Sequence, residues 1–262
     1  MELKLKNKIV LVTGGAGIEG SIGHTIIFTL AKEGAIPIIL DRNMRGMEYE
    51  KKLQQSIPKA RFFQTDLSKP EEIKSSVEKV TEEFSGIDVI INNVGVNDGA
   101  SLESSIEEFM NSIHLNLLSY YATVKFALPL LKKNKGNILN IGSKVAVTGQ
   151  GGTSGYAASK GGVLALTREW AVDLIQYQIR CNALIIAESM TPAYQNWLDT
   201  LKDGTQKRKS IEEKIPFGNR MTTPQEIADM AMFIISEKSS HTTGQFIYVD
   251  GGYVHLDRAL LK

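Results

Sequence analysis

The stretch "VTGGAGIEGSIGHTI", Val12 to Ile26, places a glycine-rich turn between an apolar run and a helical pattern. We expect a strand that ends at Thr13 and a helix that begins near Ser21, with the turn between them. A turn in this position offers backbone N–H groups and the positive end of the helix dipole to a pyrophosphate. The stretch therefore predicts a dinucleotide-binding βα unit. A glycine-rich turn without a ligand is the alternative on this motif alone.

The rest of the chain repeats the same alternation of short apolar runs and helical patterns. Such alternation is typical of βαβ units in a parallel sheet. We expect strands over Lys8–Thr13, Ile36–Leu40, Arg61–Thr65, Val89–Asn92, Asn137–Ile141, Ile179–Leu184 and Phe246–Val249. The pattern predicts an α/β, single-domain Rossmann fold over residues 1–262, a doubly wound seven-stranded parallel sheet in the order 3-2-1-4-5-6-7. Helices would cover both faces, and ligands would bind at the carboxyl ends of the strands.

Composition excludes several classes of function. The 262 residues are 42% hydrophobic and 23% charged with a net charge of +1, and no basic block is long enough to indicate a nucleic-acid partner. Cys181 is the only cysteine, which precludes an internal disulfide, and the four histidines show no metal-ligand spacing. No apolar run reaches the length of a membrane span, and the N-terminus enters a strand at once. We expect a cytoplasmic, metal-free protein with a small-molecule ligand.

A carboxylate stands where a bound dinucleotide would place its adenosine ribose. Asp41 ends the second expected strand, eighteen residues past Gly23, and its carboxylate could accept hydrogen bonds from the ribose hydroxyls. This favours NAD, because a 2'-phosphate would be repelled there. Arg42 follows at once and could pair with such a phosphate, so NADP remains the alternative.

Two further motifs follow strands at the same edge of the sheet. "DL", Asp66 and Leu67, follows the third strand, and "NNVG", Asn92 to Gly95, follows the fourth. These segments resemble the short-chain dehydrogenase/reductase family, with Val94 in place of the usual alanine. The resemblance implies that Asp66 and Leu67 contact the adenine and that Asn93 and Gly95 belong to the cofactor site.

The segment "SGYAASKGG" carries the strongest chemical signal, because Tyr156 and Lys160 share one face of a helix. Tyr121 and Lys125 have the same spacing, but only Tyr156 follows a strand-end hydroxyl, Ser143, thirteen residues earlier. We interpret Tyr121 and Lys125 as helix surface or packing. A neighbouring ammonium favours a phenolate, so Lys160 would make Tyr156 a base at neutral pH.

These residues match the catalytic Ser, Tyr and Lys of the family. The resemblance implies that Ser143 holds the substrate oxygen, that Tyr156 takes the hydroxyl proton, and that Lys160 also bonds the nicotinamide ribose. It implies that Asn116, in "HLNLLSYY", is the fourth member and holds a water of the proton relay. A capping or exposed asparagine is the alternative.

The glycine-rich turn departs from the family pattern, because its run from Thr13 to the last glycine is three residues longer than usual. The spacing resembles instead the cofactor loop of the enoyl reductase branch, in which a glycine is followed after five residues by Ser-Ile, here Gly15, Ser21 and Ile22. That branch places six residues between its tyrosine and lysine, whereas three separate Tyr156 and Lys160. We interpret the turn, including Gly17, as an extended phosphate loop with Ser21 and Ile22 at the helix N-terminus.

The segment after the sixth strand, "NALIIAESMTP", also departs from the family. Ile186 and Ala187 replace the usual Pro-Gly before Thr191, the residue that reaches the nicotinamide carboxamide in relatives. The departure places Glu188 beside the nicotinamide, where a carboxylate could accept hydrogen bonds from two sugar hydroxyls. A surface glutamate paired with a lysine is the alternative.

Six further motifs lie largely in the loops: "GVNDG", "SKVAVTGQGGTSGY", "ALTREWAV", "ESMTPAYQNW", "SHTTGQ" and "VDGGYVHLDRAL". Together they resemble bacterial L-fucose dehydrogenases within this family, which oxidise the anomeric carbon of an aldopyranose to a lactone. The expected substrate-binding residues are mostly polar and comprise Asn97, Ser143, Gln150, Tyr156, Glu188 and Trp197. A substrate lid is expected near residues 188–216, and the tail could fold over the site with His255 and Arg258.

The alternative activity is a carbonyl reductase of the same family acting on a keto-sugar or 3-ketoacyl substrate. The resemblance also implies a homotetramer, with helices near Lys160–Ile175 and Glu103–Leu131 pairing across subunits.

Overall fold

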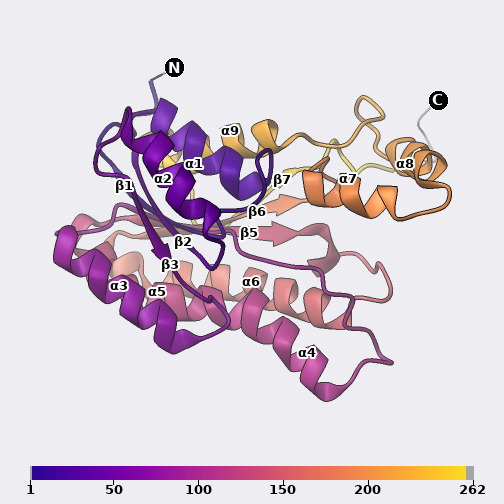
Figure 1. Ribbon diagram of the computed structural model, residues 1–262, viewed down its shortest axis with the longest axis horizontal. Coiled ribbons are helices and arrows are strands. Elements are labelled where there is room, and N and C mark those ends of the chain that lie inside the picture. The colour runs from indigo at the N-terminus through magenta and orange to yellow at the C-terminus, as the bar shows by residue number, and fades with distance from the viewer. Residues whose placement is uncertain (1, 258–262) are drawn as a thin grey trace.

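The computed structural model describes residues 2–257 as a seven-stranded parallel sheet with helices on both faces (Figure 1). The strand order is β3-β2-β1-β4-β5-β6-β7, which confirms the predicted fold and topology. The strands are β1 Ile9–Thr13, β2 Ile36–Asp41, β3 Arg61–Gln64, β4 Val89–Asn92, β5 Asn137–Ser143, β6 Arg180–Ile186 and β7 Phe246–Val249. The order reverses between β1 and β4, so the carboxyl ends of these two strands mark the point where such folds bind ligands.

Two sets of helices lie on opposite sides of the sheet (Figure 1). The first set is α1 Ile22–Lys32, α2 Arg45–Gln54 and α9 Pro224–Ile235. The second set is α3 Pro70–Glu83, α4 Ile106–Ile113, α5 Ser119–Asn134 and α6 Ser154–Asp173. The helices α7 Pro192–Asp199 and α8 Gly204–Glu212 lie beyond the carboxyl end of β6 instead, within the segment where we expected a lid (Figure 1).

The core lies in two layers, because successive side chains of a strand point to opposite faces of the sheet. In β1, Val10 and Val12 pack into the layer beneath α1 and α9, whereas Leu11 packs into the layer beneath α3, α5 and α6. All three side chains are fully buried. Both faces of the sheet are therefore mainly apolar, with buried asparagines such as Asn140 and Asn182 hydrogen-bonded inside the strands.

The largest differences from the predicted strands are at the carboxyl ends of β5 and β6, and one expected helix is interrupted; one end each of β1, β2 and β3, and the start of β6, differ from the prediction by one residue. Strands β5 and β6 each extend two residues past their expected ends, and Ser143 pairs with Ile186 in the last step of their register. Ser143 is thus the last residue of β5 and not the first residue after it. The helix expected over Glu103–Leu131 is interrupted by a π-helix, η1, at His114–Leu118. The 3-10 turns are η2 Lys144–Ala146, η3 Ile175–Tyr177 and η4 Glu237–Ser239.

The C-terminal segment packs against β7 as far as the structure describes it. The His255 ring meets the ring of Tyr248 edge-on, with their centroids 4.3 Å apart. Arg258, expected near the substrate, lies outside the described residues. Across residues 2–257, the structure contains no helix with the length and apolar character needed to cross a membrane.

Candidate active site

The three residues of the predicted catalytic set come together at the carboxyl end of β5. Ser143 ends this strand, and α6 begins eleven residues later and presents Tyr156 and Lys160 one turn apart. The Ser143 hydroxyl lies close enough to Tyr156 to act on the pKa of that phenol, which it lowers. The Lys160 Nζ lies 5.7 Å from the centre of the Tyr156 ring. A hydroxyl, a phenol and an amine therefore share one site, as the sequence predicts.

Lys160 is buried beneath this site, with 2% of its surface exposed. Its Nζ donates to the Ile141 carbonyl oxygen at 2.8 Å and to the Tyr120 hydroxyl at 3.0 Å. Burial lowers the pKa of Lys160 to about 7, because desolvation penalises the ammonium. At neutral pH this side chain is therefore poised between its charged and neutral forms.

The pKa of Tyr156 is shifted upward, whereas the sequence led us to expect that Lys160 lowers it. Burial raises the pKa of Tyr156, and the Ser143 hydroxyl counteracts that rise only in part. The expected lowering by the Lys160 ammonium is not seen, because desolvation penalises both charged forms. In the protein alone, then, the phenol holds its proton at neutral pH.

Asn116 lies in the π-helix η1, and its side chain is fully buried. Its Oδ1 accepts from the Val96 backbone N–H at 2.8 Å, while its Nδ2 donates to the Val96 carbonyl at 3.0 Å. The same amide also donates to the Ser112 carbonyl. Asn116 is therefore neither exposed nor a cap: it clamps the loop after β4, and π-helices are often found where a fold positions a functional group.

The loop after β4 in turn fixes the glycine-rich turn. Asn93 Nδ2 donates to the carbonyl oxygens of Thr13 and Gly14, at 3.1 and 3.0 Å. Gly14 has a φ of +71°, and a Cβ there would lie 2.8 Å from the Val94 Cα, so only glycine is accommodated. On its other side this loop reaches Lys160, since a Cβ on Gly95 would lie 3.3 Å from Lys160 Nζ. One short segment thus connects the turn to Lys160.

The extra length of the turn forms an outward tip. Ile18 and Glu19 are exposed, and Gly20 approaches the Pro192 ring at the start of α7. The helix α1 begins at Ile22 directly after this tip, with Ser21 as its N-cap. The turn therefore opens onto a helix N-terminus, as the sequence predicts.

The carboxylate of Asp41 lies beside this turn. One of its oxygens accepts from the Ala16 N–H and the other from the Asn43 N–H, each at 2.9 Å. Gly15 packs against Ile39 of β2, the strand that ends in Asp41. The Gly17 carbonyl accepts a hydrogen bond from the Tyr49 hydroxyl of α2. A carboxylate, a close-packed glycine turn and a helix N-terminus are the groups that hold a dinucleotide, so these residues fit such a cofactor.

The other predicted cofactor residues lie along the same edge of the sheet. Arg42 is exposed, whereas Leu67 is buried and Asp66 is half-buried. Hydrogen bonding from Ser68 lowers the pKa of Asp66. Ile186 ends β6, and Thr191 caps α7 by accepting from the Tyr194 N–H at 3.2 Å.

A polar cluster lies just past the carboxyl ends of β5 and β6, next to Ser143 in the chain. The Lys144 ammonium donates to one oxygen of Glu188, and the Tyr194 hydroxyl donates to the other oxygen at 2.8 Å. Both charged side chains are largely buried, with 10% and 14% exposed. The Lys144 ammonium also lies 4.4 Å from the centre of the Tyr253 ring. Glu188 is paired with a lysine, as the alternative interpretation held, but the pair is buried beside the site and not on the surface.

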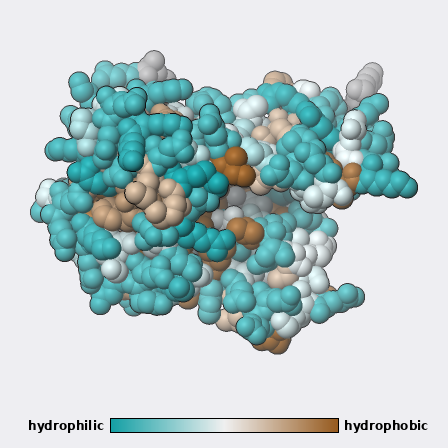
Figure 2. Space-filling model, viewed as in Figure 1, coloured by the Kyte–Doolittle hydropathy of each residue, from teal (hydrophilic) through white to brown (hydrophobic). Residues whose placement is uncertain are grey.

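The remaining expected substrate residues lie at the periphery. Asn97 and Gln150 are exposed on the loops after β4 and β5. Trp197 is 43% exposed and meets the Tyr194 ring edge-on at 5.2 Å. Figure 2 shows this side of the molecule hollowed between the part that carries α7 and α8 and the part that carries α4. Only Trp197 among these three contacts the polar cluster, through Tyr194.

Sequence reasoning assigned no role to three residues of this region: Tyr120, Lys144 and Tyr194. Tyr194 has its pKa raised by burial and by the Glu188 carboxylate. Lys144 directly follows Ser143, and its position at a strand end was the one available signal. Tyr120 follows Asn116 by one helical turn, but nothing in the sequence indicates that it reaches Lys160.

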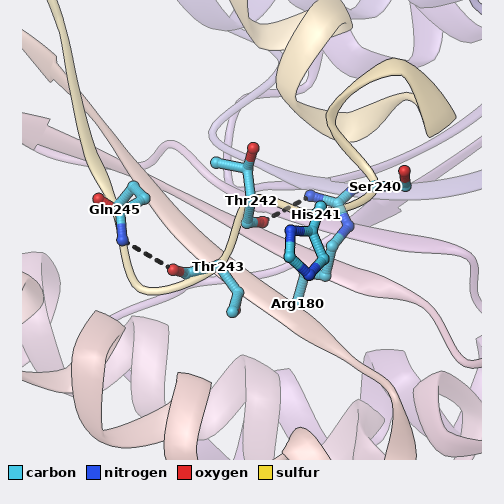
Figure 3. Close-up of a pocket in the computed structure, with 6 residues that line it drawn as sticks. All are labelled: Arg180, Ser240, His241, Thr242, Thr243 and Gln245. Carbon is cyan, nitrogen blue, oxygen red and sulfur yellow. Dashed lines mark hydrogen bonds between the residues drawn. The ribbon is translucent and has the colours of Figure 1, made fainter.

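A second pocket lies at the amino end of β6, away from these residues (Figure 3). Its Arg180 guanidinium donates to the carbonyl oxygens of Ile234, Ser236 and Thr242. Burial lowers the pKa of Arg180. The guanidinium is committed to main-chain carbonyls, so Arg180 holds this pocket together.

Three comparisons with known proteins agree with this geometry. A family model described as Enoyl-(Acyl carrier protein) reductase matches residues 15–254. The chain is 33% identical over 255 residues to 3-oxoacyl-[acyl-carrier-protein] reductase FabG of Thermotoga maritima, covering 96% of this chain and 100% of that protein. It is also 33% identical over 255 residues to L-fucose dehydrogenase of Bos taurus, covering 96% and 91% of the two chains.

A solved structure is more similar still. The crystal structure of Cj0485 dehydrogenase has 42% sequence identity and a TM-score of 0.94, with all of both chains covered. The matched family model spans the glycine-rich turn, Ser143, Tyr156 and Lys160, which the structure gathers at one edge of the sheet. The chain belongs to the short-chain dehydrogenase/reductase family.

Proposed function

We propose that this protein oxidises the anomeric hydroxyl of an aldopyranose, L-fucose or a sugar with the same ring stereochemistry, to its lactone with NAD. The observation that carries the proposal is the polar cluster of Lys144, Glu188 and Tyr194 beside Ser143. An ammonium, a carboxylate and a phenol suit a polyhydroxylated ligand, whereas a steroid or acyl chain requires a mostly apolar lining. The similarity to bovine L-fucose dehydrogenase supports the same class of substrate.

In the proposed reaction Ser143 binds the anomeric oxygen and Tyr156 takes its proton. The O–H bond breaks toward the phenolate oxygen, the C–H bond breaks with departure of hydride, and the C=O bond of the lactone forms. Membership of the family implies a nicotinamide cofactor, which accepts the hydride when bound. Because Ser143 lies near enough to Tyr156 to influence its pKa, one substrate oxygen can contact both hydroxyls in this proposal.

Lys160 makes this proton transfer possible. It is the only ammonium that the structure places close to the Tyr156 ring among the described residues, and a positive charge there favours the phenolate. It also bonds the nicotinamide ribose in this proposal. Asn116 contributes by clamping the Val96 backbone, which holds the loop after β4 against Lys160.

The cofactor in this proposal is NAD. The Asp41 carboxylate lies at the adenosine end of the site, where it would accept from ribose hydroxyls and repel a 2'-phosphate. Arg42 is exposed and makes room for either cofactor, so NADP remains the second choice. At the other end, Ile186 and Thr191 border the nicotinamide.

Substrate recognition falls to the loops after β4, β5 and β6. Glu188 is held by Lys144 and Tyr194, and each of its oxygens keeps a lone pair for a sugar hydroxyl. Asn97, Gln150 and Trp197 complete the wall in this proposal. Residues 188–216, which include α7 and α8, act as the lid, and the contact of Gly20 with Pro192 connects this lid to the phosphate turn.

A screen of aldoses with NAD and NADP, followed by the absorbance of the reduced nicotinamide, tests the proposal. We expect L-fucose, D-arabinose and L-galactose, which share ring stereochemistry, to be oxidised faster than D-glucose, and NAD to be preferred. Equal rates for D-glucose, or no turnover of any aldose, would contradict the assignment of substrate.

A carbonyl reductase is the second candidate, because the similarity to the Thermotoga maritima reductase is as high. Such an enzyme would keep Ser143, Tyr156 and Lys160 and reduce a keto-sugar or 3-ketoacyl substrate with NADPH. Rapid reduction of an acetoacetyl thioester, without aldose oxidation, would favour this function over the first.

We also infer that the protein works in the cytoplasm as a homotetramer. An apolar groove supports the assembly and is lined by Met110, Ile113, Leu117, Leu118, Tyr121 and Leu166. These residues come from α4, η1, α5 and α6, the region expected to pair across subunits. Light scattering on the purified protein measures the mass, and a monomer would contradict the inference.

A further inference from the structure

Tyr120 is a second phenol in contact with the catalytic lysine. It lies on α5 and is 1% exposed. Its hydroxyl is 3.0 Å from Lys160 Nζ and donates to the Ile141 carbonyl oxygen at 3.1 Å. The same carbonyl accepts from Lys160 Nζ at 2.8 Å. Three polar atoms from α5, β5 and α6 thus form a closed triangle beneath Tyr156.

The directions of these bonds define what Tyr120 does. Its single proton is given to the Ile141 carbonyl, so its oxygen can only accept from Lys160. Burial raises the pKa of Tyr120 far above its ordinary value, which keeps this proton in place. The phenol therefore acts on Lys160 as a fixed, neutral acceptor.

The triangle also fixes where Lys160 can act. Two of the three N–H bonds of the ammonium point to Tyr120 and Ile141, which leaves one for the side of the active site. Gly95 lies against another side of the Lys160 ammonium, because a Cβ added to it would be 3.3 Å from Nζ. The titratable groups that face Lys160 from the surrounding elements are the phenols of Tyr120 and Tyr156.

We propose that Tyr120 is a positioning residue that holds the Lys160 ammonium in place for its action on Tyr156. The proposal rests on the catalytic roles proposed above for Lys160 and Tyr156. An acceptor stabilises a charged donor more than a neutral one. Removal of the Tyr120 hydroxyl therefore weakens the protonated form of Lys160 and, through it, the phenolate of Tyr156.

The variant Tyr120→Phe removes only this oxygen, and the Ile141 carbonyl keeps its bond from Lys160, so no buried acceptor is stranded. Tyr121→Phe is the matched control, because Tyr121 is the adjacent residue of the same helix and is 44% exposed. Its ring lies 5.7 Å from the exposed Lys125 ammonium and lines the apolar groove assigned above to the subunit contact, and its hydroxyl is not among the acceptors of Lys160 Nζ.

With any aldose that the wild type oxidises, we expect Tyr120→Phe to lower kcat about tenfold at neutral pH and to move its rising limb about one unit to higher pH. The KM for the sugar should change less than about twofold, since Tyr120 does not reach the substrate. Tyr121→Phe should match the wild type. An unchanged pH profile in Tyr120→Phe would overturn the proposal even if kcat fell.

Unfolding by urea gives a readout that needs neither cofactor nor substrate. Tyr120→Phe should destabilise the protein more near pH 6, where Lys160 is charged, than near pH 9, where it is neutral. A loss of stability that is equal at both pH values would indicate a packing role only and overturn the proposal. Because this measurement is independent of turnover, failure of the proposed sugar substrate would leave its result intact.

Discussion

Replacement of Lys160 by methionine should make the protein more stable while it abolishes activity. Methionine is of similar length and apolar, so it fills the buried site without the cost of desolvating an ammonium. The Ile141 carbonyl keeps its hydrogen bond from Tyr120, so no polar atom is left without a partner by the change. The expected gain in the free energy of unfolding follows from the lowered pKa of Lys160.

A pKa lowered from the ordinary value of 10.5 to about 7 corresponds to about 5 kcal/mol of unfavourable free energy for the ammonium in the folded protein. Because the pKa is lower in the folded chain, the unfolded chain binds more protons between about pH 7 and 10.5. Wild-type stability should therefore rise with pH through this window. The gain from Lys160→Met should be largest near pH 6, up to about 5 kcal/mol, and fall to about 2 kcal/mol near pH 9.

Urea unfolding of the wild type and Lys160→Met, followed by circular dichroism at one fixed protein concentration, measures this difference. Lys79→Met on the exposed face of α3 is the control and should show no such pH dependence. Two results would refute the reasoning: a Lys160→Met protein less stable than the wild type near pH 6, or a difference in stability that does not change with pH.

Two further predictions concern the proposed chemistry. Tyr156→Phe should reduce aldose oxidation by a factor of about 10²–10⁴ or more while binding of reduced cofactor, measured by fluorescence titration, is retained; full turnover in this variant would exclude Tyr156 as the base. Glu188→Gln keeps the shape of the side chain but removes the charge, and should raise the KM for L-fucose by about tenfold with little change in kcat. Steady-state kinetics of Glu188→Gln measures this effect, and an unchanged KM would show that Glu188 does not bind the substrate.

The fold was predictable because its signal is local. Each buried strand is a short apolar run, and each run is followed by a helical pattern, so the alternation alone predicts a parallel sheet. The predicted strand ends are wrong where the apolar run stops before the strand does. Gly142 and Ser143 extend β5 through pairing with β6, and this pairing does not depend on apolar side chains.

The π-helix at His114–Leu118 escaped prediction for a related reason. A π-helix inserts one extra residue into a helix, which shifts the apolar face without ending it. The sequence pattern over Glu103–Leu131 therefore reads as one helix. The π-helix coincides with a tertiary contact: Asn116 is buried and holds the Val96 backbone, twenty residues earlier in the chain.

The proposed active site could be predicted only in part. Residues close together in the chain were predicted to meet, whereas contacts between distant residues were not. Tyr156 and Lys160 are four residues apart on one helix, and Ser143 ends the preceding strand, so their meeting follows from secondary structure. Lys144 and Glu188 are 44 residues apart, and Tyr120 and Lys160 are 40 apart. Such pairs depend on which helix covers which strand and at what register.

Those distant pairs are also the ones that set the electrostatics of the site. Burial by α5 and β5 lowers the pKa of Lys160, and the same burial raises the pKa of Tyr156. A motif specifies that an amine and a phenol meet, but the energy of each charge depends on how deeply the surrounding elements bury it. Tyr120 bears on this balance, because α5 brings its hydroxyl to the Lys160 ammonium as a second acceptor beside the Ile141 carbonyl. The chemistry proposed for this protein therefore depends on a residue whose role only the folded chain reveals.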